Sequence, residues 1–111
     1  MAKVDPKIVA GVAAAFQAAK DASTKTYEAM GGDQFACGFA WVNIKPGTSK
    51  VAKYLKENYN ARRSYYGGID VWNPGGLNVQ NIDIKEDGAQ AFAKVLREQL
   101  GVTAYASSRL D

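Results

Sequence analysis

Apolar and small side chains alternate strictly along residues 34–44, which predicts a β-strand. One side of this strand carries Phe35, Cys37, Phe39 and Trp41, and the other carries Ala36, Gly38, Ala40, Val42 and Ile44. No charged residue interrupts the segment, so we expect it at the centre of a sheet. One face is broad and aromatic and the other is small and smooth. Each must be covered or serve as a binding surface.

A long helix is predicted ahead of this strand. Asp5 and Pro6 are typical of an N-cap and a first helical position, and Gly31 is typical of a left-handed cap after Met30. Seven residues form one narrow stripe at spacings of three and four: Val9, Val12, Phe16, Ala19, Ser23, Thr26 and Met30. We expect the helix to lie across the sheet, with self-association through the stripe as the alternative.

The rest of the chain alternates between helical and extended patterns. A helix capped by Thr48 or Ser49 is expected to reach Tyr59, followed by a loop over residues 60–68. Strands are predicted at 69–73 and 78–82, joined as a hairpin through the Asn-Pro-Gly-Gly turn at 73–76. A capping box of Asp83 and Glu86 predicts a helix that ends before Gly101, and a last strand follows at 102–107.

This order predicts an α+β fold. After the long N-terminal helix (1–32), residues 33–111 read β-α-β-β-α-β, the split pattern of ferredoxin-like domains. We expect one domain over residues 1–111, with a four-stranded antiparallel sheet in the spatial order 4-1-3-2. The small face of the opening strand would then lie under the two helices of the split motif. The aromatic face would lie on the other side.

Composition is that of a globular protein. Of the 111 residues, 47% are hydrophobic and 23% are charged, which is enough for one modest core. No apolar run is long enough to cross a bilayer, and the spaced apolar residues around Lys3 do not predict a secretory signal. The lone Cys37 fits a reducing compartment and is expected to be a small buried side chain. We therefore expect a cytoplasmic protein without a membrane partner.

Positive charge is concentrated in one segment. Residues 45–63 carry six basic side chains against Glu57 alone, a local charge of +5 within a net +3 for the chain. Such a patch can attract phosphates or an acidic protein, and it can equally be a solvated helix face. Arginines and tyrosines follow one another at its end, as Arg62, Arg63, Tyr65 and Tyr66.

The aromatic face of the sheet is expected to collect Phe35, Phe39, Trp41, Asp70, Trp72, Thr103, Tyr105 and Arg109. An apolar patch of this size needs a cover or a partner. The N-terminal helix is the first candidate for the cover. A stacking surface for nucleic-acid bases and an interface with a protein partner or a second copy are the alternatives. Asp70 is expected to pair with Arg109 or with an edge amide, or else to mark a site.

Two resemblances add to this interpretation. Residues 37–44, Cys-Gly-Phe-Ala-Trp-Val-Asn-Ile, resemble the longer ribonucleoprotein signature of RNA-recognition domains, although Cys37 and Ile44 depart from it. The resemblance implies that Phe39 and Trp41 stack on bases. Residues 37–42, 66–68 with Trp72, 86–96 and 108–111 are also similar to small uncharacterised proteins of tailed bacteriophages. That similarity covers the last two-thirds of the chain and implies the cytoplasm of an infected cell, with no activity attached.

Catalysis is not expected. The chain has no histidine, so zinc sites, triads and imidazole acid–base pairs lack their usual side chain. The glycine pairs at 67–68 and 75–76 match neither phosphate-binding pattern and are explained as turns. Asp83, Glu86 and Asp87 are explained as acids at a helix start. We expect no cofactor and no metal.

The sequence thus favours a small binding protein. The leading hypothesis is nucleic-acid binding through the basic helix and loop at 45–63, aided by the aromatic face of the sheet. Its candidate residues are Lys50, Lys53, Lys56, Arg62, Arg63, Tyr65, Tyr66, Phe39, Trp41 and Trp72. The alternative is a protein-interaction module, such as a phage-encoded modulator of a host protein or a homo-oligomer. A small-molecule site under the N-terminal helix is a third possibility.

Overall fold

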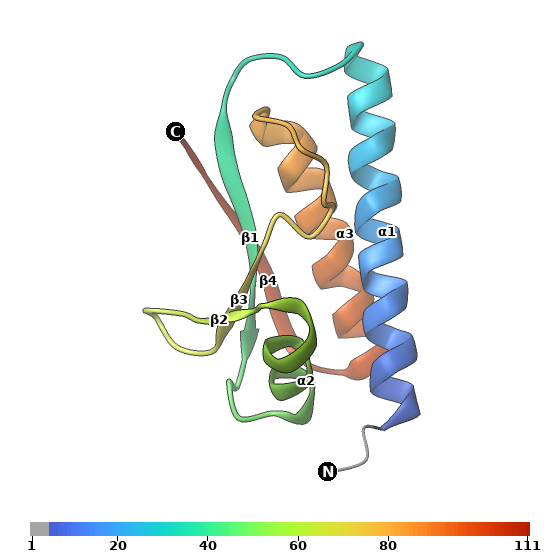
Figure 1. The fold of residues 1–111 in the computed structure, drawn as a ribbon, viewed down its shortest axis with the longest axis vertical. Helices are drawn as coiled ribbons and strands as arrows, with labels where there is room; N and C mark the ends of the chain where they lie inside the picture. Colours follow the sequence, from blue (N-terminus) through green and yellow to red (C-terminus); the bar gives the residue numbers. More distant parts are fainter. Residues whose placement is uncertain (1–4) are drawn as a thin grey trace.

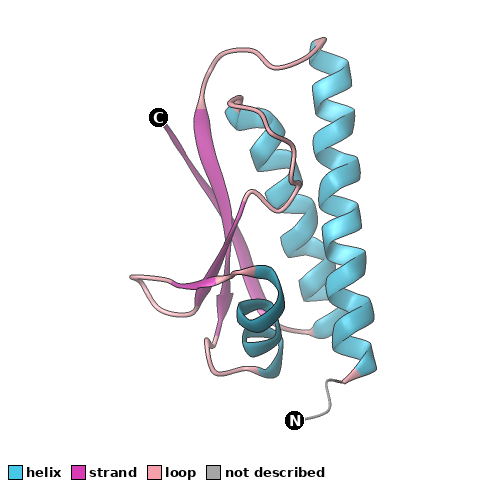
Figure 2. Ribbon diagram, viewed as in Figure 1, coloured by secondary structure: helices cyan, strands magenta, loops and turns pink. Residues whose placement is uncertain are grey.

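The computed structural model describes residues 5–111 and shows an α+β protein in which three helices lie on one side of a four-stranded antiparallel sheet (Figures 1 and 2). The elements follow in the order α1 (Pro6–Met30), β1 (Gly38–Lys45), α2 (Lys50–Tyr59), β2 (Arg62–Arg63), β3 (Ile69–Trp72), α3 (Ile82–Leu100) and β4 (Thr103–Leu110). The segment around Lys3, for which no secretory signal is expected, lies outside the described residues.

β1 is central in the sheet, as its uncharged sequence predicts. The strands lie side by side in the order β2-β3-β1-β4, and every neighbouring pair is antiparallel. Trp41 on β1 lies opposite Trp72 on β3 and opposite Ser107 on β4. β4 therefore forms one edge of the sheet along its whole length, and the two-residue β2 forms the other.

The predicted strand at 78–82 is wrong, and so is the hairpin built on it. Residues 77–81 are irregular apart from a single bridge between Cys37 and Asn81. The Asp33 carboxylate accepts the backbone N–H groups of Gln80 and Asn81 at 3.0 and 2.9 Å, so these donors are satisfied without a neighbouring strand. The hairpin of this sheet joins β2 to β3, within a region predicted to be a loop.

The helix boundaries follow their local signals, with one correction. Asp5 caps α1 and Gly31 ends it in the left-handed conformation, as predicted, and Ser49 caps α2. At α3 the capping box of Asp83 and Glu86 is wrong. The Asn81 side chain caps this helix by accepting from the Ile84 N–H at 3.0 Å, and its amide also donates to the carbonyls of residues 34 and 35. Asn81 thus joins the start of α3 to the chain that leads into β1.

α1 packs along α3 and does not cover the aromatic face of the sheet, which corrects the expectation for this helix (Figure 1). Small residues let the two helices approach closely. Gly11 lies directly against the Leu100 side chain. The buried Ser23 hydroxyl donates to the Ile84 carbonyl at 2.8 Å, and a Cβ on Gly88 would collide with that hydroxyl. Val12, Ala19 and Ser23 of the predicted stripe are therefore buried on the helix side, whereas Val9 is 40% exposed.

The core lies between the helices and the small face of the sheet. Ala40, Val42 and Ile44 of β1 are buried there with side chains from β3, β4, α2 and α3. The prediction for the small face is confirmed, except at Ala36, which is exposed ahead of the strand. Among residues 5–111, no helix combines the length and apolarity that a bilayer crossing requires.

Candidate functional site

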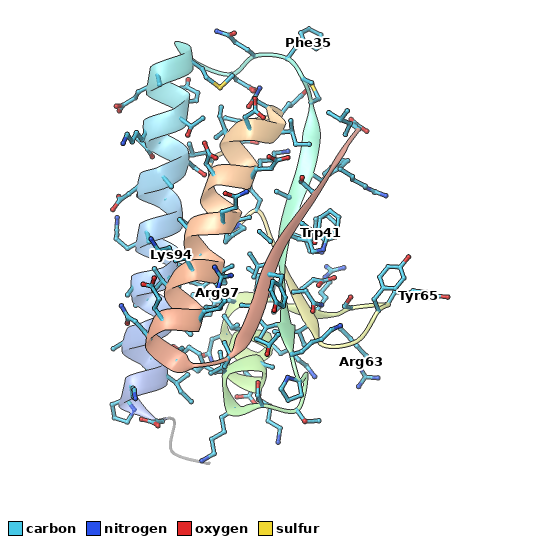
Figure 3. The ribbon with its side chains drawn as sticks, turned by 180° about the vertical axis from the view of Figure 1, so that it is seen from behind. Phe35, Trp41, Arg63, Tyr65, Lys94 and Arg97 are labelled. Atoms are coloured by element: carbon cyan, nitrogen blue, oxygen red, sulfur yellow. The ribbon has the colours of Figure 1, made fainter. Side chains whose placement is uncertain are left out.

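None of the three helices covers the other face of the sheet in the part of the chain that the structure describes. Alternation in each strand directs side chains onto this face, and we call eight of them the open sheet face: Phe39, Trp41, Asn43, Asp70, Trp72, Tyr105, Ser107 and Arg109. Figure 3 shows the Trp41 side chain directed away from the helices. Six of the eight residues predicted for the aromatic face are in this set, and Thr103 continues the same alternation at the end of β4. Phe35 is 90% exposed ahead of β1, so its assignment to this face is wrong.

Three aromatic rings form a continuous cluster at the centre of this face. The ring centroids of Trp41 and Trp72 are 4.6 Å apart at an interplanar angle of 30°, and Phe39 meets Trp72 edge-on at 6.4 Å. Trp72 keeps 48% of its surface accessible, while Phe39 and Trp41 are half-buried. Because Phe39 and Trp41 stand on β1 and Trp72 on β3, the two inner strands fix their spacing. The cluster offers an aromatic platform that needs no rearrangement of the backbone.

Positive side chains surround this cluster. The Arg109 guanidinium lies 5.4 Å and the Lys85 Nζ 5.3 Å from the centroid of the Phe39 ring, distances suited to cation–π attraction. Lys85 reaches the sheet from the first turn of α3 and donates to the Gly38 carbonyl at 2.8 Å. Lys45 and Arg62 stand at the other end of the face.

Asp70 is the one acid among the eight residues of the open sheet face, and its expected pairing is wrong. The Asn43 side-chain amide donates to the Asp70 carboxylate at 2.9 Å, and the same amide donates to the Gly67 carbonyl at 2.9 Å. Neither Arg109 nor an edge amide is its partner among the described residues. Asn43 on β1 therefore connects the central strand to the hairpin that joins β2 to β3.

That hairpin projects on the same side as Trp41 and carries two exposed tyrosines (Figure 3). Tyr65 and Tyr66 are 94% and 84% accessible, and their rings meet edge-on at 5.1 Å. Gly68, at φ +71°, lies against the backbone of Ile44 with no room for a side chain, which holds the hairpin close to β1. The tyrosines and Arg63 thus border one end of the open sheet face.

The lysines of α2 are not part of this surface. Val51, Ala52 and Leu55 turn one side of α2 into the core, and Lys50, Lys53 and Lys56 are exposed on its outer side, within the helix layer. The structure therefore divides the predicted site. Phe39, Trp41 and Trp72 come together, the four hairpin residues border them, and the three lysines lie apart.

Three contributors to the site were absent from the candidate binding residues. Arg109 was expected on the aromatic face but was given no binding role, and Asn43 follows the same alternation as Trp41, so both positions were available from the sequence. Lys85 had no such signal, because it belongs to a helix and reaches the sheet only through the turn after Asn81.

A cleft of about 590 Å³ lies next to Trp72, at the sheet edge where β2 begins. Its walls combine aromatic, amide and basic side chains, from Phe16, Tyr59, Asn60, Arg62, Val71, Trp72, Asn73, Pro74 and Gly76. Partial burial, followed by a hydrogen bond with Tyr54, raises the pKa of the Tyr59 phenol. Tyr59 is therefore neutral at physiological pH. Within residues 5–111, no cluster of acids and Cys37 is arranged to hold a metal ion.

Comparison with known proteins gives no guide to this site. No protein-family model matches the chain, and neither a curated protein nor a solved structure matches it. The interpretation therefore depends on the geometry of the chain itself.

Proposed function

We propose that this protein binds single-stranded nucleic acid on its open sheet face and does not catalyse a reaction. The observation that carries the proposal is the uncovered cluster of Phe39, Trp41 and Trp72 with Arg109 and Lys85 beside it. Bases present a flat π-face that stacks on such rings, and the surrounding cations are suited to phosphates.

Stacking and charge would act together. Stacking contributes roughly 1–3 kcal/mol per base in proteins of this kind. The phosphates would meet Arg109 and Lys85 at one end of the face and Lys45 with Arg62 at the other. A duplex is a poorer ligand, because its bases are already stacked on one another and their faces are hidden.

We also propose that residues 33–111 form a ferredoxin-like unit. The order β2-β3-β1-β4 and the connections through α2 and α3 support it. Ile69–Trp72 holds the inner place that residues 78–82 were expected to hold, and Arg62–Arg63 holds the edge place expected for residues 69–73. In that arrangement the aromatic residues occupy the two inner strands. The resemblance of residues 37–44 to the ribonucleoprotein signature agrees with a stacking role for Phe39 and Trp41. The resemblance to phage proteins adds the proposal that binding takes place in a bacterial cytoplasm.

The basic segment at 45–63 has a smaller part in this proposal than its charge suggests. Only its two ends, Lys45 and the arginines of β2, border the open sheet face. Lys50, Lys53 and Lys56 would act through the long-range field that attracts a polyanion.

The test is a titration of a labelled single-stranded oligonucleotide with the full chain, followed by fluorescence anisotropy at low and moderate salt. We expect saturable binding that weakens with salt and a much weaker signal with a duplex of the same sequence. Absence of binding to both single-stranded DNA and RNA at low salt would overturn the proposal. A pull-down from nuclease-treated bacterial lysate then tests the alternative, a host protein bound to the same aromatic cluster.

A further inference from the structure

Within residues 5–111, no strand lies beside the outer edge of the sheet along β4. β4 is eight residues long, and its residues 103–108 contain no charge and no proline. The opposite edge is formed by β2, which has only two residues, both of them arginine. Proteins usually blunt an exposed edge with charges, prolines, bulges or a short strand, because its free backbone groups pair with other chains. β2 follows that practice and β4 does not.

The ladder between β1 and β4 identifies which groups of β4 are free. The N–H of Asp111 donates to the Cys37 carbonyl at 3.1 Å, which fixes the odd-numbered residues of this segment as those bonded to β1. Ala104, Ala106, Ser108 and Leu110 therefore direct their backbone groups outward. The Arg97 guanidinium donates to the Ala104 carbonyl at 2.7 Å, as this assignment requires. No comparable side-chain cap is present at Ala106, Ser108 or Leu110 among the described residues.

We propose that two copies of this chain pair through antiparallel β4 strands, with the twofold axis at Ser107. This register places Ala106 opposite the partner's Ser108 and Ala104 opposite the partner's Leu110, and each pair can exchange both backbone hydrogen bonds. Ser107 then faces the partner's Ser107 as a non-hydrogen-bonded pair, in which Cα atoms are about 4.5 Å apart. The assembly would be a closed dimer.

Two features favour this partner and this register. Tyr105 would lie directly opposite the partner's Arg109 on the open sheet face, a cross-strand pairing of a phenol ring with a guanidinium. On the helix side, the Glu86 carboxylate accepts from the Ser108 hydroxyl and the Arg97 guanidinium donates to the Ala104 carbonyl, so one acid and one base stand at different positions along this side of the strand. Antiparallel pairing brings opposite ends together. Complementary charge of this kind favours a second copy over an unrelated strand.

The dimer would also extend the surface described above. Two open sheet faces would join into one, with their aromatic clusters on either side of the axis. This inference concerns the β4 edge and does not depend on what the aromatic cluster binds.

Cysteine scanning tests the register. In a Cys37→Ser background, we expect Ser107→Cys to form an intermolecular disulfide readily under mild oxidation, because its Cα separation falls within the range that a disulfide spans. Ala106→Cys and Ser108→Cys are matched neighbours one residue away and should cross-link far less. Equal cross-linking at all three positions, or a maximum at 106 or 108, would overturn the register.

Sedimentation of the wild-type chain tests the dimer itself. We expect a dimer at tens of micromolar, and at least a tenfold weaker association for Ser107→Lys, which places two like charges at the axis. Thr103→Lys adds the same charge at the end of the strand and should leave the dimer intact. Far-ultraviolet circular dichroism verifies that each variant is folded. A wild-type chain that stays monomeric up to 100 μM, or two lysine variants that behave alike, would refute the proposal.

Discussion

Replacing Trp72 with alanine removes the most accessible ring of the aromatic cluster. Trp72 is 48% accessible, so about half of its surface is already open to a ligand, and its ring contacts both Trp41 and Phe39. If one base stacks there, the loss of roughly 1–3 kcal/mol weakens binding about 5- to 150-fold. A phenylalanine at this position retains a π-face and should restore most of the affinity.

Trp72→Ala also lowers the free energy of unfolding, and the binding assay must be kept free of this effect. Burying about half of a tryptophan removes on the order of 100 Å² from water, which is worth about 2–3 kcal/mol of folding free energy. Because the ring lies outside the core, we expect Trp72→Ala to fold with a lowered midpoint of unfolding. Binding is therefore measured by anisotropy well below that midpoint.

Tyr27→Ala is the matched control for Trp72→Ala. Tyr27 is 40% accessible on α1, within the helix layer. Its loss should leave the dissociation constant unchanged. If Trp72→Ala and Tyr27→Ala bind a single strand equally well, stacking on the open sheet face is refuted.

Three further predictions address charge, the hairpin and the helix packing. Arg109→Gln should reduce the slope of log affinity against log salt by about 0.7, the value for one phosphate contact on a single strand. Lys53→Gln should change this slope much less. Equal changes would contradict the assignment of phosphate contacts to Arg109 and not to the lysines of α2. Asn43→Ala removes the side-chain amide that donates to both Gly67 and Asp70. Backbone amide hydrogen exchange should therefore accelerate in the β2–β3 hairpin and stay unchanged in α3. Unchanged exchange in the hairpin would refute the anchoring role of Asn43. Gly88→Ala places a methyl group against Ser23. It should lower the free energy of unfolding, measured in urea, by about 1–3 kcal/mol, the usual cost of overpacking. An unchanged free energy of unfolding would contradict the close packing of α1 on α3 at this position.

Elements with a local signal were predictable from the sequence. The strict alternation in β1 identified a central strand and assigned its two faces correctly. Asp5 and Gly31 marked the ends of α1 because each acts on the backbone next to it.

Elements that depend on distant contacts were not predictable in the same way. Residues 78–82 have the composition of a strand, but Asp33, far away in the chain, occupies the N–H groups that a ladder would use. β2 consists of two arginines and exists because the hairpin brings them beside β3. The position of α1 followed from Gly11 and Gly88, whose small size permits close contact with α3, rather than from its apolar stripe alone.

In the candidate site, too, the features with a local sequence signal were predictable and those set by the tertiary fold were not. Phe39, Trp41 and Trp72 share a face by alternation and strand register, so the aromatic cluster was predictable. The +5 charge of residues 45–63 suggested one basic surface, yet α2 turns its lysines toward the helix side. The charge of a segment does not show to which side of the fold its side chains point.

Intrinsic fluorescence provides the most direct test of the central claim, that the open sheet face is the binding surface. The chain has two tryptophans, and both stand on this face, so their emission reports on it alone. Titration with an unlabelled single-stranded oligonucleotide should quench the emission saturably, and added salt should restore it. Binding that is detected by sedimentation while the tryptophan emission stays constant would contradict the claim.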